Sequence, residues 1–235
     1  MQFTKLCSPT LKQLFIEQLE TMILSGQLQI GEKLPSERAL AAAMQISRSV
    51  VNAGIADMAD KGFLEIIPRS GTYVADYRRR GTLDTLVSIM KFNGGTLPDS
   101  EVRSILELRK VLIILSLELA IPRIQDAELG ELTACSLLLH SAETPQHAAE
   151  IVFDFDHKLS FFSGNTLLPL IFYSFKAPIM TLWERYFRLY GYERMCCRTD
   201  EILAAIRARD TDSAVACISH SIAETLHGRT MLYNS

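Results

Sequence analysis

Two short helix-forming runs within residues 34–64 constrain the fold of this chain more than any other feature of the sequence. Only the break at residues 45–47 separates them. Ser36 and Glu37 open the first run, just after Pro35, and Ser47 can cap the second, because a serine hydroxyl accepts a hydrogen bond from an amide of the first helical turn. Gly62 follows the second run, as glycine commonly follows a helix. The segment therefore predicts two helices joined by a tight turn.

The flanking segments extend this pair of helices into a larger unit. Residues 11–24 repeat apolar side chains with a period of about 3.6 residues, which predicts a preceding helix. Residues 63–67 and 72–76 alternate between polar and apolar side chains, and the turn at residues 68–71 joins them as a hairpin. This order of elements predicts that residues 1–76 form a winged helix-turn-helix domain of three helices and a two-stranded wing.

The rest of the chain has a different character. We expect residues 77–100, with their charged and glycine-rich breaks, to form a linker and the first helix of a second domain. From residue 101 to residue 235 the apolar pattern predicts only helices, with Pro178 kinking or splitting one of them. The predicted helices are 101–121, 126–141, 145–163, 167–189, 199–208 and 212–226. The fold class is therefore mainly α, with a winged helix-turn-helix followed by an all-α antiparallel helical bundle.

The composition is that of a globular protein, with 48% hydrophobic and 22% charged residues. The longest apolar stretches fall far short of the roughly 20 residues that span a bilayer. The first residues lack the features of a signal peptide, so we expect a cytoplasmic protein with no membrane partner. Five irregularly spaced cysteines without a CxxC pair suit neither a zinc site nor a disulfide framework.

Charge is distributed unevenly along the chain. Residues 1–80 contain 10 Lys or Arg and 8 Asp or Glu, whereas the other 155 residues contain 14 and 19. A basic first third and an acidic remainder predict two domains with different partners, the first suited to nucleic acid.

The second helix of a helix-turn-helix enters the major groove of DNA, where its first residues meet the bases. Arg48 can donate two hydrogen bonds to guanine, and Asn52 can make a bidentate contact with adenine. Serines at the start of this helix suit phosphate oxygens, and the tip of the hairpin suits phosphate or the minor groove. The predicted DNA-binding residues are Arg38, Ser47, Arg48, Ser49, Asn52, Arg69, Ser70 and Gly71.

These residues resemble the GntR superfamily of bacterial transcription regulators. The resemblance covers residues 11–76 and includes Leu-Pro-Ser-Glu-Arg from residue 34, Ser-Arg from residue 47 and Gly-Thr-x-Val from residue 71. Residues 105–112, 153–165 and 200–222 resemble the effector domain of the FadR-like subfamily, called the FCD domain. The resemblance implies a homodimer that binds a palindromic double-stranded operator. It also implies a small ligand in each helical bundle that alters the affinity for DNA.

The sequence departs from the family at two places. Asn52 and Ala53 stand where the family usually has Arg-Glu, so we expect adenine rather than guanine at the corresponding base.

The second departure concerns the metal that many FadR-like domains hold with one aspartate and three histidines. The resemblance places Val152, Asp156, Thr199 and Ser221 at these positions, so we expect no metal or other cofactor. One alternative is a shifted metal site made of Asp154, His157, Asp200 and His220.

Arg109 occupies the position that the family turns toward a carboxylate ligand. A guanidinium inside a bundle needs an anionic partner, and a ligand, Glu107 or Asp156 can each supply it. The ligand is either a small organic acid or a larger acyl compound such as an acyl-CoA. The predicted effector-binding residues are Arg109, Asp156, Phe153, Asn165, Tyr186 and Thr199.

The sequence argues against an enzyme, because it contains no nucleophile elbow, phosphate-binding glycine loop or HExxH motif. The main hypothesis is a regulator whose affinity for DNA responds to a ligand. The alternative is a constitutive DNA-binding regulator whose helical domain only dimerises.

Overall fold

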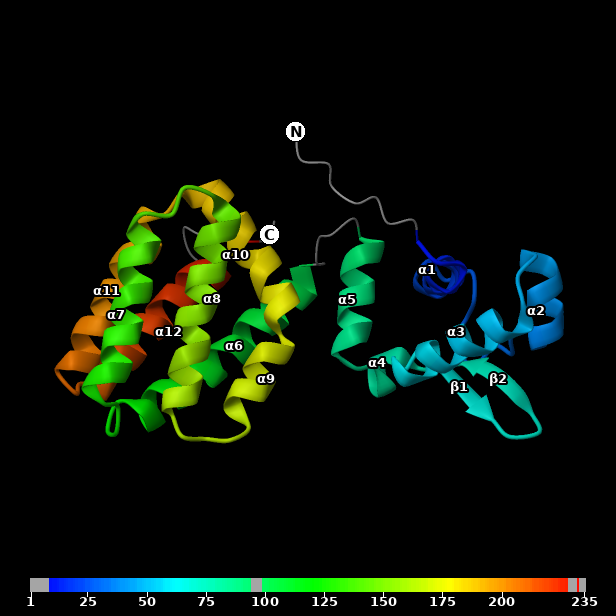
Figure 1. Cartoon of the computed structure of the whole chain (residues 1–235), viewed down its shortest axis with the longest axis horizontal. Coiled ribbons are helices and arrows are strands. Elements are labelled where there is room, and N and C mark those ends of the chain that lie inside the picture. Colours follow the sequence, from blue (N-terminus) through cyan, green and yellow to red (C-terminus); the bar gives the residue numbers. More distant parts are fainter. Residues whose placement is uncertain (1–8, 94–98, 228–231, 233–235) are drawn as a thin grey trace. The chain divides into compact units, whose positions relative to one another are not determined.

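The computed structural model describes residues 9–93, 99–227 and 232. The chain divides into two compact units, Met1–Gly95 and Thr96–Ser235 (Figure 1). Within the described residues, no helix is both long enough and apolar enough to cross a membrane.

The first unit contains the predicted winged helix-turn-helix, which is confirmed. Its elements are α1 (Leu11–Leu24), α2 (Glu37–Met44), α3 (Arg48–Asp60), β1 (Leu64–Ile67), β2 (Gly71–Val74), α4 (Tyr77–Arg80) and α5 (Leu83–Phe92). The two strands pair antiparallel, with Leu64 opposite Val74 and Ile67 opposite Gly71. This hairpin is the wing.

The core of the first unit lies between α1, α3 and the wing. Val51, Met58 and Phe63 have no exposed surface, and Phe15 packs among them. A Cβ atom at Gly54 would lie 2.3 Å from a ring carbon of Phe15. Glycine at this position therefore lets α3 approach α1 closely, which sets the direction in which the outer face of α3 points.

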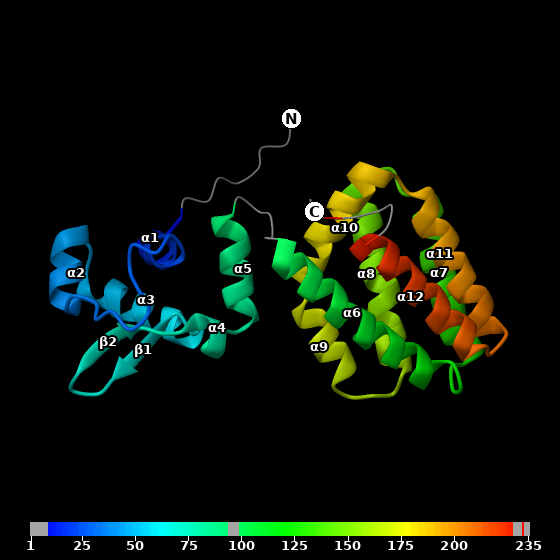
Figure 2. The ribbon, with the colours of Figure 1, turned by 180° about the vertical axis from the view of Figure 1, so that it is seen from behind.

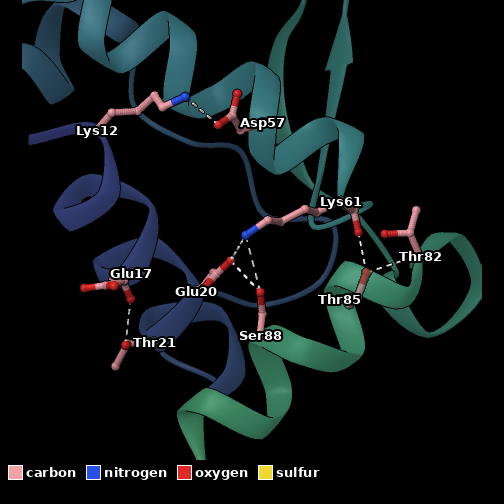
Figure 3. A network of polar contacts seen from close by, with 9 residues as sticks. All are labelled: Lys12, Glu17, Glu20, Thr21, Asp57, Lys61, Thr82, Thr85 and Ser88. Atoms are coloured by element: carbon pink, nitrogen blue, oxygen red, sulfur yellow. Dashed lines mark hydrogen bonds and ion pairs between the residues drawn. The ribbon is translucent and has the colours of Figure 1, made fainter. Parts of the chain in front are cut away.

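Helix α5 belongs to the first unit, whereas residues 77–100 were predicted to form a linker and the first helix of the bundle. Lys61 Nζ donates to Glu20 Oε1 at 2.8 Å, and Ser88 Oγ donates to the same oxygen at 2.7 Å (Figure 3). The Thr85 hydroxyl also donates to the carbonyl of Lys61. These bonds join α1, the end of α3 and α5 around one buried carboxylate, and no local sequence pattern signals them.

The second unit contains the predicted helical bundle, which is also confirmed. Its helices are α6 (Asp99–Ala120), α7 (Asp126–His140), α8 (Pro145–Phe162), α9 (Leu168–Ser174), α10 (Lys176–Tyr190), α11 (Glu193–Arg207) and α12 (Thr211–His227). Helix α8 packs against α6, α7 and α10, while α12 packs against α6 and α11 (Figures 1 and 2).

Two helix boundaries differ from the prediction. The helix predicted over residues 167–189 breaks near Phe175 and not at Pro178, which is the third residue of α10. Proline is tolerated in a first turn, because the amide it lacks would have no helical partner there. Helix α11 begins at Glu193, well before the predicted start at Thr199, and this difference brings Arg198 into the helix.

Candidate nucleic-acid interface and buried arginine cluster

The turn between α2 and α3 explains the break at residues 45–47. Gln45 ends α2 in the left-handed conformation, with φ of 53°, and the amide of Ile46 donates to the carbonyl of Ala41 at 3.1 Å. Ser47 Oγ accepts a hydrogen bond from the amide of Val50 at 3.3 Å. A C-cap and an N-cap therefore follow each other directly, so the chain turns without a longer loop.

The predicted recognition residues lie on the solvent side of α3. Arg48, Ser49 and Asn52 are exposed, whereas Val51 and Ile55 on the opposite face are buried. Because the first amides of a helix lack helical partners, this exposed start of α3 also suits an anion such as a phosphate.

A groove of about 350 Å³ lies between the starts of α2 and α3 and the wing. Its lining residues are Lys33, Leu34, Pro35, Ser36, Glu37, Arg38, Arg48, Ser70, Gly71 and Thr72. The structure therefore brings together four of the predicted DNA-binding residues, from three separate segments. Three cationic side chains and one carboxylate line the groove, which gives it a positive balance.

The tip of the wing has a constrained backbone. Arg69 is exposed and has a positive φ of 64°, while Ser70 Oγ and Tyr73 Oη lie 2.7 Å apart. Gly71 has a φ of 132°, and a Cβ atom there would lie 2.8 Å from Lys33 Cε. The positive φ explains a glycine at this position, beside the groove, because the flexible end of Lys33 could move aside.

Asn52 has a neighbour that the sequence analysis missed. Two acceptors surround its amide, so the nitrogen faces them and donates to Glu37 Oε2 at 2.8 Å and to the carbonyl of Arg48 at 3.1 Å. Glu37 is the first residue of α2, so this contact crosses the turn between the two helices.

A helix with an exposed polar start, set beside a two-stranded wing and a basic groove, defines a winged helix-turn-helix DNA-binding protein. Residues 12–74 match the family described as bacterial regulatory proteins, gntR family, and residues 104–224 match the FCD domain. The chain belongs to the GntR family of bacterial transcription regulators and carries an FCD domain, as its resemblance to FadR-like regulators implied.

The chain is similar to regulators from several bacteria. The chain is 36% identical over 163 residues to the HTH-type transcriptional regulator Mce2R of Mycobacterium tuberculosis, covering 68% of this chain and 67% of that protein. It is 28% identical over 190 residues to LutR of Bacillus subtilis, covering 72% and 84%. A solved structure of Lar from Listeria monocytogenes shares the fold, with a TM-score of 0.64, 16% identity and coverage of 94% of this chain and 96% of that one. These relatives are regulators, and this chain is a transcription regulator rather than an enzyme.

A buried charged cluster lies in the helical unit. Arg109 of α6 donates to Asp156 Oδ2 of α8, and Arg198 Nη2 of α11 lies 3.7 Å from Asp156 Oδ1. The ring of Trp183, on α10, has its centroid 4.4 Å from the guanidinium carbon of Arg109 and 5.7 Å from that of Arg198. Asp156 is therefore the internal partner of Arg109. Glu107 is exposed and pairs with Arg103 instead.

The cluster contains two guanidinium groups and one carboxylate, with side chains at most 5% exposed. Five of the six guanidinium nitrogens have no hydrogen-bond acceptor, namely Nε and Nη1 of Arg109 and all three of Arg198. Burial lowers the pKa of Arg109 to about 10, an effect that Asp156 opposes and Arg198 increases. Arg109 therefore keeps its charge at neutral pH, and the cluster carries one positive charge in excess. Arg198 was not among the predicted site residues.

An open groove of about 450 Å³ leads from the surface to Arg198. Its lining residues, from the end of α10, α11 and α12, are Tyr186, Glu193, Arg194, Met195, Cys197, Arg198, Glu201, Cys217, His220, Ser221 and Glu224. Charged and polar side chains predominate. The lining includes three glutamates and two arginines, and the three side-chain nitrogens of Arg198 are buried.

The other predicted effector-binding residues fall in different places. Tyr186 lines the groove and packs edge-on against Trp183, with ring centroids 5.6 Å apart. Thr199 is buried, and its hydroxyl donates to the carbonyl of Met195 at 2.8 Å. Phe153 and Asn165 do not line the groove. Phe153 packs with aromatic rings beside α9, and Asn165 Oδ1 accepts from two amides at the start of α9.

The four residues of the alternative metal site do not converge. Asp154 lies 3.6 Å from Lys158 on its own helix, whereas His157 Nε2 lies 3.2 Å from the carbonyl of Pro169. Asp200 accepts from the hydroxyl of Ser136 at 2.6 Å, and His220 lines the groove beside α12. Within the described part of the chain, no three His, Cys, Asp or Glu residues gather closely enough to hold a metal ion.

Proposed function

We propose that this chain is a homodimeric, sequence-specific transcription regulator whose affinity for a palindromic operator is controlled by a small organic acid bound in its helical unit. The observation that carries the ligand part is the unmatched positive charge of Arg198, buried beside Arg109 and Asp156. As a bacterial DNA-binding regulator, it would act in the cytoplasm.

In the DNA-bound state, α3 lies in the major groove and Arg48 donates to the N7 and O6 atoms of a guanine. Ser47 and Ser49 at the start of α3, and Arg38 in the groove beside them, bind phosphate oxygens. Arg69, Ser70 and Gly71 at the tip of the wing contact the backbone or the minor groove. The exposure of Arg48 and Arg69 supports these assignments.

A stripe of exposed apolar side chains on α6 supports a dimer. Leu108, Val111, Leu115 and Leu119 lie three or four residues apart and are between 36% and 62% exposed. This spacing places them on one side of the helix, as in a helix–helix seam. In a twofold dimer the same stripe of each copy meets its equivalent, which matches the symmetry of a palindromic operator.

The ligand proposed here is an anion, because a buried guanidinium is stabilised by a carboxylate within hydrogen-bonding distance. The groove beside Arg198 is lined mainly by charged and polar side chains and has a volume of about 450 Å³. These features favour a compact organic acid over an acyl-CoA, whose acyl chain needs an apolar surface.

Ligand control follows from a shift between two arrangements of the dimer. A ligand changes the population of the DNA-binding arrangement only if it binds one arrangement more tightly than the other. Because the half-sites lie about 34 Å apart, a modest rotation of one recognition helix removes it from its half-site.

Thermal unfolding of the full-length protein with acetate, lactate, malonate and citrate at matched ionic strength tests the ligand part. A ligand at about 100 times its Kd adds about 2.7 kcal/mol to the free energy of unfolding, so at least one acid should raise the melting temperature. Arg198→Ala should abolish this rise, whereas Arg207→Ala, at an exposed position on α11, should retain it. If no acid changes either the melting temperature or the binding to DNA, the constitutive alternative replaces ligand control.

A further inference from the structure

We infer that Glu37 determines base specificity at the position that Asn52 reads, by holding the Asn52 amide so that only its carbonyl oxygen faces the DNA. This inference rests on the proposed entry of α3 into the major groove. Glu37 makes no base contact in this proposal, and it acts by positioning Asn52.

The hydrogen bonds of Asn52 carry the argument. An asparagine amide has two N–H donors and one acceptor oxygen. Here the nitrogen donates to Glu37 Oε2 at 2.8 Å and to the carbonyl of Arg48 at 3.1 Å, so both donors are in use. The side chain of Asn52 is nevertheless exposed, which leaves its oxygen available to a partner outside the protein.

Glu37 is well placed to hold this amide. It is the first residue of α2, where a carboxylate interacts favourably with the helix dipole, and Ser36 caps the same helix. It is half-buried and lines the groove beside Arg48. A hydrogen bond to a carboxylate is also stronger than one to a neutral acceptor. Rotating the amide toward a base would therefore break the stronger of its two bonds.

The consequence for base recognition follows from the edges that bases present in the major groove. A bidentate contact with adenine needs one donor and one acceptor from the asparagine, and the donor is already engaged. An acceptor alone can receive a hydrogen bond from N6 of adenine or N4 of cytosine. Guanine and thymine present only acceptors to hydrogen bonds there, so they are disfavoured. The expected preference is therefore adenine or cytosine, rather than adenine alone.

The test is selection of binding sites from a duplex DNA library with a randomised core, using purified full-length protein. In the wild type, one position of each half-site should accept adenine and cytosine about equally, and Asn52→Ala should lose this preference. Glu37→Ala frees the amide donor, so adenine should exceed cytosine there by roughly fivefold, the effect of one added hydrogen bond. Glu37→Gln retains an acceptor and should select as the wild type does. Glu17→Ala, which removes an exposed carboxylate of α1, is the matched control.

A second variant tests the inference without changing Glu37. Asn52→Asp has no donor for Glu37 or for the carbonyl of Arg48, so its side chain is no longer held and the equal selection of adenine and cytosine should be lost. A wild-type profile in either Asn52→Asp or Glu37→Ala would overturn the inference. The proposed entry of α3 into the major groove has its own test. It is wrong if Arg48→Ala selects the same sites as the wild type, or if no sites are enriched. In either case the inference about Glu37 is wrong as well, because it depends on that entry.

Discussion

Arg48 and Arg198 are both proposed to bind an anion, but they lie in opposite surroundings. Arg48 is exposed at the start of α3, whereas the side chain of Arg198 is 5% exposed between helices. Salt screens the interactions of an exposed charge, while a buried charge interacts strongly and is costly to leave unpaired. The exposed arginine can therefore dock on DNA without affecting the fold, whereas the proposed ligand of the buried arginine would also stabilise the bundle.

Removing Asp156 gives the largest effect expected from this comparison. Asp156→Ala leaves Arg109 and Arg198 buried without their internal carboxylate, which should lower the free energy of unfolding by about 3–5 kcal/mol. Urea denaturation of the full-length protein measures the change. Acetate should restore part of the loss, because it can enter as a substitute carboxylate. Unchanged stability in Asp156→Ala would contradict the view that the cluster depends on a buried anion.

Arg48→Ala should weaken binding to DNA and leave the free energy of unfolding unchanged. One good bidentate contact discriminates between bases by about 1–3 kcal/mol, so affinity for a selected operator should fall by roughly 5- to 150-fold. Fluorescence anisotropy at fixed salt measures affinity, and urea denaturation checks the fold. Arg78→Ala, at an exposed position on α4 outside the groove, is the control. A stability change as large as that of Asp156→Ala would show that Arg48 is not free for DNA.

The last prediction concerns the contacts that hold α5 in the first unit. Ser88→Ala removes one of the two donors to the buried carboxylate of Glu20 (Figure 3). A hydrogen bond to a charged group contributes about 1.5–3 kcal/mol, so stability should fall by an amount in this range. Binding to DNA should remain, because α3 keeps its packing on α1. Hydrogen exchange should show faster opening of α5, and equal exchange in both proteins would argue against the role of Ser88.

The elements of the DNA-binding unit were predictable because their signals are local. Ser36 and Ser47 each cap a helix within three residues of themselves, and the strands alternate over a few positions. The outward face of α3 followed from the same periodicity. The partner of Asn52 did not, because Glu37 lies across a turn whose geometry depends on the left-handed conformation of Gln45.

The helical unit was predictable as a set of helices but not as a site. Arg109 and Asp156 lie 47 residues apart in the sequence, and two acidic residues were equally plausible partners for this arginine. Arg198 was missed because it precedes the predicted start of its helix, and a charged residue gives no periodic sign of burial. Phe153 and Asn165, which were predicted to bind the effector, have packing and capping contacts within the bundle.

The sequence by itself determined where the first three helices and the wing of the first unit lie, and which face of α3 is polar. Those features depend on N-caps, turns and apolar periodicity, which act between residues close in the chain. Only the tertiary structure decided which charges are buried together, how Asn52 is oriented and which unit holds α5. Each of these depends on side chains from separate helices that pack together. A buried charge there is stabilised by a partner that cannot be identified from the order of residues along the chain.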